Sequence, residues 1–105
     1  MDPNAVRGHL EPMILAVLES GPLHGYAVIM AIKNGTGGEL ELNTGSVYPA
    51  LRRLEDAGHI RGSWQVVDGR RRRTYRLTAA GSRALAKQRT DWQLFTRTIG
   101  GVLDS

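Results

Sequence analysis

Residues 44–58 constrain the fold of this chain more than any other stretch, because a helical repeat of apolar residues ends there in a glycine. One stripe of the expected helix is apolar and consists of Val47, Ala50, Leu51, Leu54 and Ala57. The opposite side carries the hydroxyl of Tyr48 and the guanidinium of Arg52, with Arg53 at its edge. Gly58 supplies the stop. Such a helix suits the reading of a DNA groove, and an ordinary amphipathic surface helix is the alternative.

After Gly58 the hydrophobic period changes from helical to alternating. Residues 60–67 alternate and predict a strand, Asp68-Gly69 is a strong signal for a tight turn, and residues 73–77 predict the return strand. The tip and second leg of this hairpin carry an arginine run, namely Arg70, Arg71, Arg72, Arg73 and Arg76. Side chains alternate between the two faces of a hairpin, so the arginines from Arg70 to Arg73 cannot all contact the same DNA duplex. We expect two of them, at the tip, to do so.

Two more helices are expected before residue 44, over residues 10–20 and 24–35, with a Gly-Pro turn between them. In the second helix Ala27, Met30 and Ala31 are expected to share one side, with Ile29 and Ile32 nearby. Residues 39–42 alternate too briefly to distinguish a short strand from an anchored loop. The N-cap of the third helix is either Asn43 or Ser46.

A last helix is expected from a cap at Thr78 to a stop at Gly100-Gly101. Its apolar stripe follows a repeat of about seven residues and contains Leu85, Trp92, Phe95 and Ile99. One monomer could not easily cover this stripe, so we expect a homodimer that forms through it.

Three helices followed by a two-stranded hairpin are the order of a winged helix-turn-helix, which is mainly α with a small β-hairpin. In that arrangement the third helix enters the major groove and the hairpin, or wing, lies along the DNA backbone. We therefore predict a winged helix-turn-helix DNA-binding domain over residues 1–78, and a C-terminal dimerisation helix and tail over residues 79–105.

The composition favours an anionic partner and argues against several other functions. The formal charge is +4 and the pI is about 10.1. The absence of cysteine excludes disulfides and thiol catalysis, and the three histidines, His9, His24 and His59, lack ligand spacing. We expect no metal, no cofactor and no catalysis, and we expect His24 to hold its turn by a backbone hydrogen bond. With no secretion signal and no membrane-length apolar run, a cytoplasmic location is expected.

Three segments carry a resemblance to a known family: residues 21–26 (GPLHGY), 45–55 (GSVYPALRRLE) and 69–78 (GRRRRTYRLT). They resemble the signatures of PadR-like transcriptional regulators, and the resemblance spans about residues 10 to 86. It implies a dimeric bacterial or archaeal DNA-binding repressor that a small molecule or an environmental signal releases from DNA. The short C-terminal part is similar to that of the shorter branch of the family, which argues against a dedicated ligand domain.

Ten residues are candidates for contacting double-stranded DNA, with contact expected from two of the four hairpin arginines: Thr44, Ser46, Tyr48, Arg52, Arg53, Tyr26, Arg70, Arg71, Arg72 and Arg73. Thr44 and Ser46 serve as caps, DNA contacts or both, and Tyr26 either packs or binds phosphate. Trp92 and Phe95 are either plain dimer-core residues or, as the resemblance implies, part of a slot for a small aromatic effector. A winged-helix protein-interaction module without DNA binding is the alternative function, and the arginine run argues against it.

Overall fold

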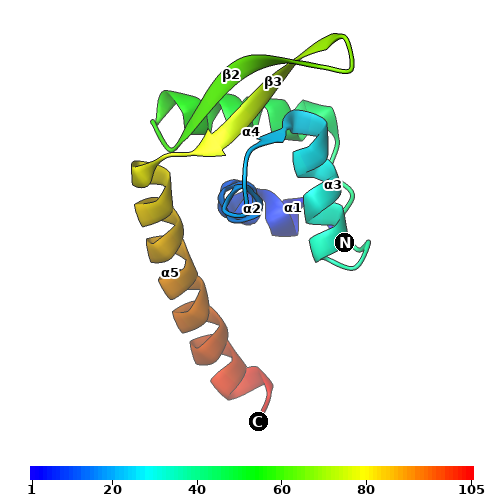
Figure 1. Ribbon diagram of the computed structural model, residues 1–105. Coiled ribbons are helices and arrows are strands. Elements are labelled where there is room, and N and C mark those ends of the chain that lie inside the picture. The colour runs from blue at the N-terminus through cyan, green and yellow to red at the C-terminus, as the bar shows by residue number, and fades with distance from the viewer.

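Six helices and three strands make up the chain, and the computed structural model describes all 105 residues except the side chain of Pro3. In chain order they are α1 (Pro3–Val6), η1 (Arg7–His9), α2 (Leu10–Leu18), β1 (Leu23–His24), α3 (Gly25–Gly35), α4 (Thr44–Asp56), β2 (Ile60–Val67), β3 (Arg70–Leu77) and α5 (Ala79–Leu103). Figure 1 shows α2, α3 and α4 gathered beneath the hairpin, and α5 leading away from it. This mainly helical fold with a small antiparallel sheet confirms the predicted winged helix-turn-helix class.

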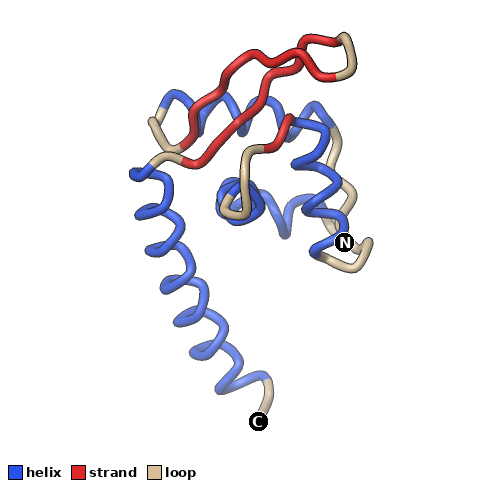
Figure 2. Tube along the Cα trace, viewed as in Figure 1, coloured by secondary structure: helices blue, strands red, loops and turns tan.

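The three strands form one antiparallel sheet in the order β1-β3-β2, shown in red in Figure 2. The hairpin register runs from Ile60 opposite Leu77 to Val67 opposite Arg70, so the turn has only two residues. Both have positive φ, 53° at Asp68 and 76° at Gly69, as the predicted tight turn requires. The return strand is longer than predicted, because backbone pairing continues up to the turn through the whole arginine run. Strand β1 was not predicted, since two residues are too short for a periodic signal.

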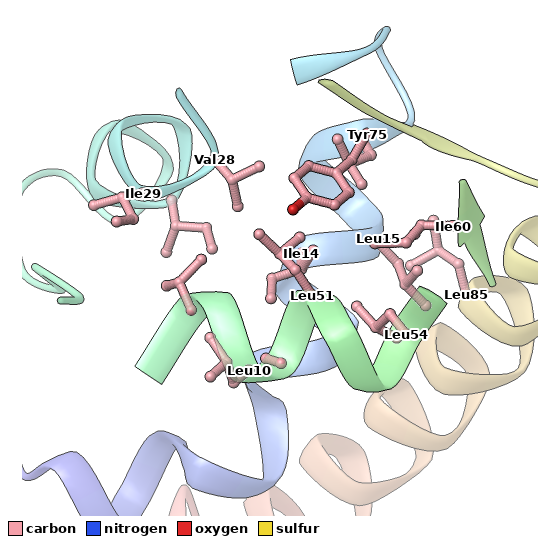
Figure 3. Packing of buried hydrophobic residues seen from close by; sticks show 14 of the residues in the cluster. Leu10, Ile14, Leu15, Val28, Ile29, Leu51, Leu54, Ile60, Tyr75 and Leu85 are labelled. Atoms are coloured by element: carbon pink, nitrogen blue, oxygen red, sulfur yellow. The ribbon is translucent and has the colours of Figure 1, made fainter. Parts of the chain in front are cut away.

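The core lies where α2, α3 and α4 meet under the sheet, and Figure 3 shows its side chains interlocking. Helices α2, α3, α4 and α5 each contribute fully buried residues, namely Ile14, Leu15, Val28, Val47, Leu51, Leu54 and Leu85. The side predicted for α3 holds only in part: Ile29 and Ile32 are buried together with Val28, whereas Ala27 and Ala31 are only partly buried and Met30 is 37% exposed. Burying the branched aliphatic side chains removes more apolar surface from water than burying the two alanines.

Asn43 is the N-cap of α4, because its Oδ1 accepts a hydrogen bond of 2.9 Å from the Ser46 amide. The alternative with Ser46 as the cap is therefore wrong, and Pro49 lies inside the helix. At the other end Gly58 adopts a φ of 77°, the left-handed conformation of a helix C-cap. The amide of His59 then donates to the Leu54 carbonyl at 2.9 Å. Residues 39–42 form an anchored loop whose buried residue is Leu40.

Helix α5 continues to Leu103, so the stop predicted at Gly100-Gly101 is wrong. Glycine weakens a helix interior by about 1 kcal/mol but does not forbid it. Leu85 is the last buried side chain, and beyond it α5 exposes Trp92, Leu94, Phe95, Ile99, Val102 and Leu103. An ion pair of 2.9 Å between Arg89 and Glu19 joins α5 to the end of α2, and the Arg89 hydrogen bond lowers the pKa of Glu19.

The junction between the hairpin and α5 is fixed by Thr78 and Gly81. The Thr78 hydroxyl accepts a hydrogen bond of 3.0 Å from the Gly81 amide and donates one of 2.6 Å to the Gly58 carbonyl. Gly81 is buried, and a Cβ atom there would clash with the His59 backbone carbonyl. This junction therefore sets the direction in which α5 leaves the rest of the fold.

Replacing Gly81 by alanine should lower the free energy of unfolding by roughly 2–3 kcal/mol, because backbone must move to admit the methyl group. Gly101→Ala is the matched control, since nothing lies within 4 Å of a Cβ at that helical glycine. We expect the control to be neutral or to stabilise by up to about 1 kcal/mol. Urea titration followed by circular dichroism measures both, and equal stabilities of the two variants would contradict the close approach.

Candidate nucleic-acid interface

The outward side of α4 presents the polar groups predicted from its sequence. Val47, Ala50, Leu51 and Leu54 are buried, and Tyr48 is 44% exposed. Arg52 is exposed on the same side of the helix. Thr44 and Ser46 are exposed in the first turn, where Asn43 provides the cap, so neither side chain makes the capping hydrogen bond. Their hydroxyl groups are therefore not used for capping the helix.

Tyr48 owes its position to a glycine in the preceding helix. A Cβ atom at Gly25 would lie 2.7 Å from Cε1, Cζ and the hydroxyl oxygen of the Tyr48 ring, so only glycine leaves room for the ring. His24 precedes it and is the N-cap of α3, its Nδ1 accepting a 3.3 Å hydrogen bond from the Ala27 amide. This confirms the predicted role of His24 in the turn. Tyr26 follows and is 60% exposed at the start of α3.

Gly25→Ala should leave stability within about 1 kcal/mol, because the clashing atoms belong to the end of a mobile side chain. On the expectation that Tyr48 contacts a base edge, DNA affinity should nevertheless fall about tenfold, which is the loss of one good contact of that kind. Tyr48→Ala should cost a similar amount, and the double variant should cost no more than either single one. Anisotropy of a labelled duplex measures the three affinities. Additive losses would show that Gly25 acts independently of Tyr48.

One face of the hairpin looks toward α4 and the other looks away from it. Residues paired across the strands share a face, so Trp64 lies beside Arg73, and Val66 beside Arg71, on the same face as the buried Tyr75. This face looks toward α4, because Tyr75 belongs to the core beneath the sheet (Figure 3). Burial raises the pKa of the Tyr75 hydroxyl.

The arginines of the hairpin fall into two groups. Arg73 bonds Glu55 of α4 at 2.6 Å, which raises the pKa of the arginine, and Arg72 lies 2.9 Å from His24 Nε2. Within the described part of the chain, Arg70 and Arg71 at the tip have no carboxylate at ion-pair distance. The structure thus leaves the two tip arginines without a carboxylate among the described residues, pairs Arg73 with Glu55 and places Arg72 beside the His24 ring.

A hollow of about 410 Å³ separates α4 from the hairpin. Its lining consists of Tyr48, Arg52, Glu55, Asp56, Arg73 and Tyr75. The Glu55 charge is balanced by Arg73. The hollow therefore brings together the outward side of α4 and the inner face of the hairpin, with the tip arginines beyond its rim.

Arg53 and Ser46 line a separate groove on the other flank of α4, next to the N-terminal segment. Arg53 Nε lies 3.4 Å from a carboxylate oxygen of Glu11 in α2. The structure does not bring these two predicted residues into the hollow that holds Tyr48 and Arg52.

Trp92 and Phe95 lie together near the middle of α5, the helix that leads away from the hairpin. Their rings stack with centroids 5.9 Å apart and an interplanar angle of 17°. His9 meets the Trp92 ring edge-on at 5.1 Å. Both rings remain about half exposed.

Two residues near the hollow were not identified from the sequence, Trp64 and Glu55. The signal for Trp64 was present, because a two-residue turn fixes the register and places it opposite Arg73. The Glu55 partnership has no local signal, since it joins two elements through the tertiary fold. Among the described residues there is no group of three or more histidine, cysteine or acidic side chains placed to hold a metal ion. No helix in this part of the chain has the length and apolar character needed to cross a membrane.

The fold and this surface define a winged-helix protein. Comparison with known families is more specific: residues 14–87 match the Transcriptional regulator PadR-like family. The chain belongs to this family of transcriptional regulators, as the sequence resemblance predicted.

Solved structures of other transcriptional regulators share this architecture over three quarters or more of the chain. A transcriptional regulator from Clostridium thermocellum aligns with a TM-score of 0.87 and 26% identity, covering 94% of this chain and 97% of that one. Bacillus subtilis PadR, solved in complex with operator DNA, aligns with a TM-score of 0.68 and 28% identity, covering 75% of this chain and 45% of that one. By sequence, the transcriptional regulator Rv3488 of Mycobacterium tuberculosis is 42% identical over 60 residues, which are 57% of this chain and 56% of that protein.

Proposed function

We propose that this PadR-family regulator is a homodimeric, sequence-specific DNA-binding repressor that acts in the cytoplasm. One observation carries the proposal: the Tyr48 and Arg52 side of α4 and the inner face of the arginine-bearing hairpin border the same hollow. A single duplex can meet both. The complex of Bacillus subtilis PadR with operator DNA supports this, because that protein aligns with three quarters of the present chain.

Different residues would serve different parts of the contact. Tyr48 and Arg52 would enter the major groove and read base edges, and Arg70 and Arg71 would bind phosphates or reach the adjacent minor groove. Hydroxyls at two helix starts, on Thr44, Ser46 and Tyr26, are proposed phosphate contacts, since backbone amides there also favour an anion. Arg72, Arg73 and Arg53 would add positive charge, although each already has a partner within the protein.

The exposed apolar side of α5 supports the homodimer. Large apolar side chains beyond Leu85 remain open to water, and residues 79–105 are proposed as the dimerisation element. In a twofold dimer each α5 would meet its own copy. The two copies of α4 would then read half-sites about 34 Å apart, which is one turn of DNA.

Release by an effector is the second part of the proposal. Trp92 and Phe95 stack in parallel and are half exposed, so a dimer would place two such pairs near its axis and form a slot for a flat aromatic molecule. Occupation of the slot would change the separation of the two DNA-binding units and weaken DNA binding. In a Trp64→Phe protein, ethidium should quench the remaining Trp92 fluorescence, and unchanged fluorescence at millimolar ethidium would remove this part.

A gel-shift titration tests the DNA-binding proposal. The probe is the duplex upstream of the protein's own gene, and the control is a shuffled duplex of equal length and composition. We expect the upstream duplex to bind at least about a hundredfold more tightly at physiological salt, at the low end of ratios for specific sites. Salt-insensitive or absent binding to both would favour the alternative, a winged-helix protein-interaction module.

A further inference from the structure

Trp64 is a large aromatic residue left open to water in the middle of the hairpin. Its side chain is 58% exposed and that of its neighbour Val66, on the same face, is 72% exposed. The face turns toward α4, and Arg73, directly opposite Trp64, lines the hollow beside Tyr48. Trp64 therefore lies at the rim of that hollow.

Two guanidinium groups hold the indole ring in place. Arg71 Cζ lies 4.9 Å from the ring centroid and Arg73 Cζ lies 5.6 Å from it. Arg73 is anchored by Glu55, and it lies across Gly62, where a Cβ atom would come within 2.7 Å of its Nε. The ring is thus oriented before any ligand arrives, as a preformed contact surface requires.

The exposed apolar side of α5 cannot cover Trp64 within one chain, because α5 runs away from the hairpin along the long axis of the molecule (Figure 1). The positive charge around Trp64 indicates what covers the ring. Arg71 beside the ring, and Arg70 next to it on the other face of the hairpin tip, have no acidic partner in the described part of the chain, which suits a polyanion. A guanidinium stacked on an aromatic ring keeps its N–H edge free for a phosphate.

We propose that Trp64 is a DNA-contacting residue, packing its ring on the deoxyribose units of one strand while Arg71 bonds the neighbouring phosphate. This inference rests on the proposed DNA binding and adds to it a contact that carries no charge. Deoxyribose is the apolar part of the backbone, so the contact would be independent of base sequence.

The test uses a labelled 30-base-pair duplex of arbitrary sequence at low salt and two proteins, each with one tryptophan. In Trp92→Phe, saturation with the duplex should reduce acrylamide quenching of Trp64 at least about twofold, because the ring becomes covered. In Trp64→Phe, the remaining Trp92 should be unaffected. The unmodified protein contains both tryptophans. Subtracting the acrylamide quenching of Trp64→Phe from that of the unmodified protein gives the protection of Trp64 with Trp92 in place.

Affinity supplies a second readout. Trp64→Ala should weaken binding about fivefold with an unchanged salt slope, because an apolar contact is lost and no ion is released. Val67→Ala, on the opposite face of β2, should bind like the unmodified protein. Full anisotropy saturation with Trp64 still open to acrylamide would overturn the inference and leave the proposed function standing. No saturation by any duplex would overturn both.

Discussion

Replacing Arg70 and Arg71 together by alanine should lower affinity for duplex DNA about a hundredfold at physiological salt, since each phosphate contact releases condensed counterions. The loss should affect operator and unrelated sequences alike, because phosphate contacts carry no base information. The slope of log affinity against log salt should decrease by about two per protomer. Fluorescence anisotropy at several salt concentrations measures both quantities. Folding should be unaffected, because both side chains are exposed at the tip and neither is part of the core.

The hairpin offers its own matched control. Arg61 and Arg76 are paired across the strands at the base of the hairpin, exposed, and on the face that looks away from α4. Replacing both by alanine removes the same charge from the same element. We expect an affinity loss below about fivefold, from the weaker long-range field alone. Equal losses of DNA affinity in the two double variants would mean that the tip arginines do not contact DNA more closely than those at the base.

Phe95→Glu should convert the protein to a monomer and lower operator affinity more than a hundredfold. In a twofold interface the new carboxylate would lie near its own copy in an apolar setting, where like charges repel strongly. A monomer engages one half-site only and loses the avidity of the second. Sedimentation velocity gives the assembly state, and a gel shift gives the affinity.

Gln93→Glu is the control, since it adds the same charge to the polar side of α5. We expect a dimer with operator affinity within about threefold of the unmodified protein, as for a typical surface substitution. If Phe95→Glu remained dimeric, the exposed stripe of α5 would not be the interface.

Local signals in the sequence predicted most of the fold. Asp68-Gly69 fixed the turn and with it the hairpin register, and the glycine at position 58 fixed the end of α4. The start of α4 was ambiguous because Asn43 and Ser46 both offer a capping oxygen, and only the tertiary structure selects Asn43. The buried side of α3 was predicted only in part, because Ala27 and Ala31 fit a helical stripe as well as the larger Val28 and Ile32 do.

The candidate site was predicted in part. The helical wheel placed Tyr48 outward, and the structure agrees. The partners of the arginines were beyond sequence reasoning, because Arg73 with Glu55 and Arg53 with Glu11 join elements whose relative placement only the folded core decides. Without those partners all arginines of a basic run look equivalent, whereas the structure distinguishes Arg70 and Arg71 at the tip from Arg73, which is paired with Glu55.

The central claim is that α4 and the hairpin meet one duplex together, and affinity cleavage tests it most directly. The chain has no cysteine, so a DNA-cleaving iron chelate can be attached to one introduced thiol. Thr44→Cys marks the start of α4, Val67→Cys marks the hairpin near its tip, and Gln93→Cys marks α5 as the control. We expect cleavage from the first two within one helical turn of each other on the upstream duplex, and none from the third. Cleavage from α5, or cuts from α4 and the hairpin separated by several turns, would contradict the account.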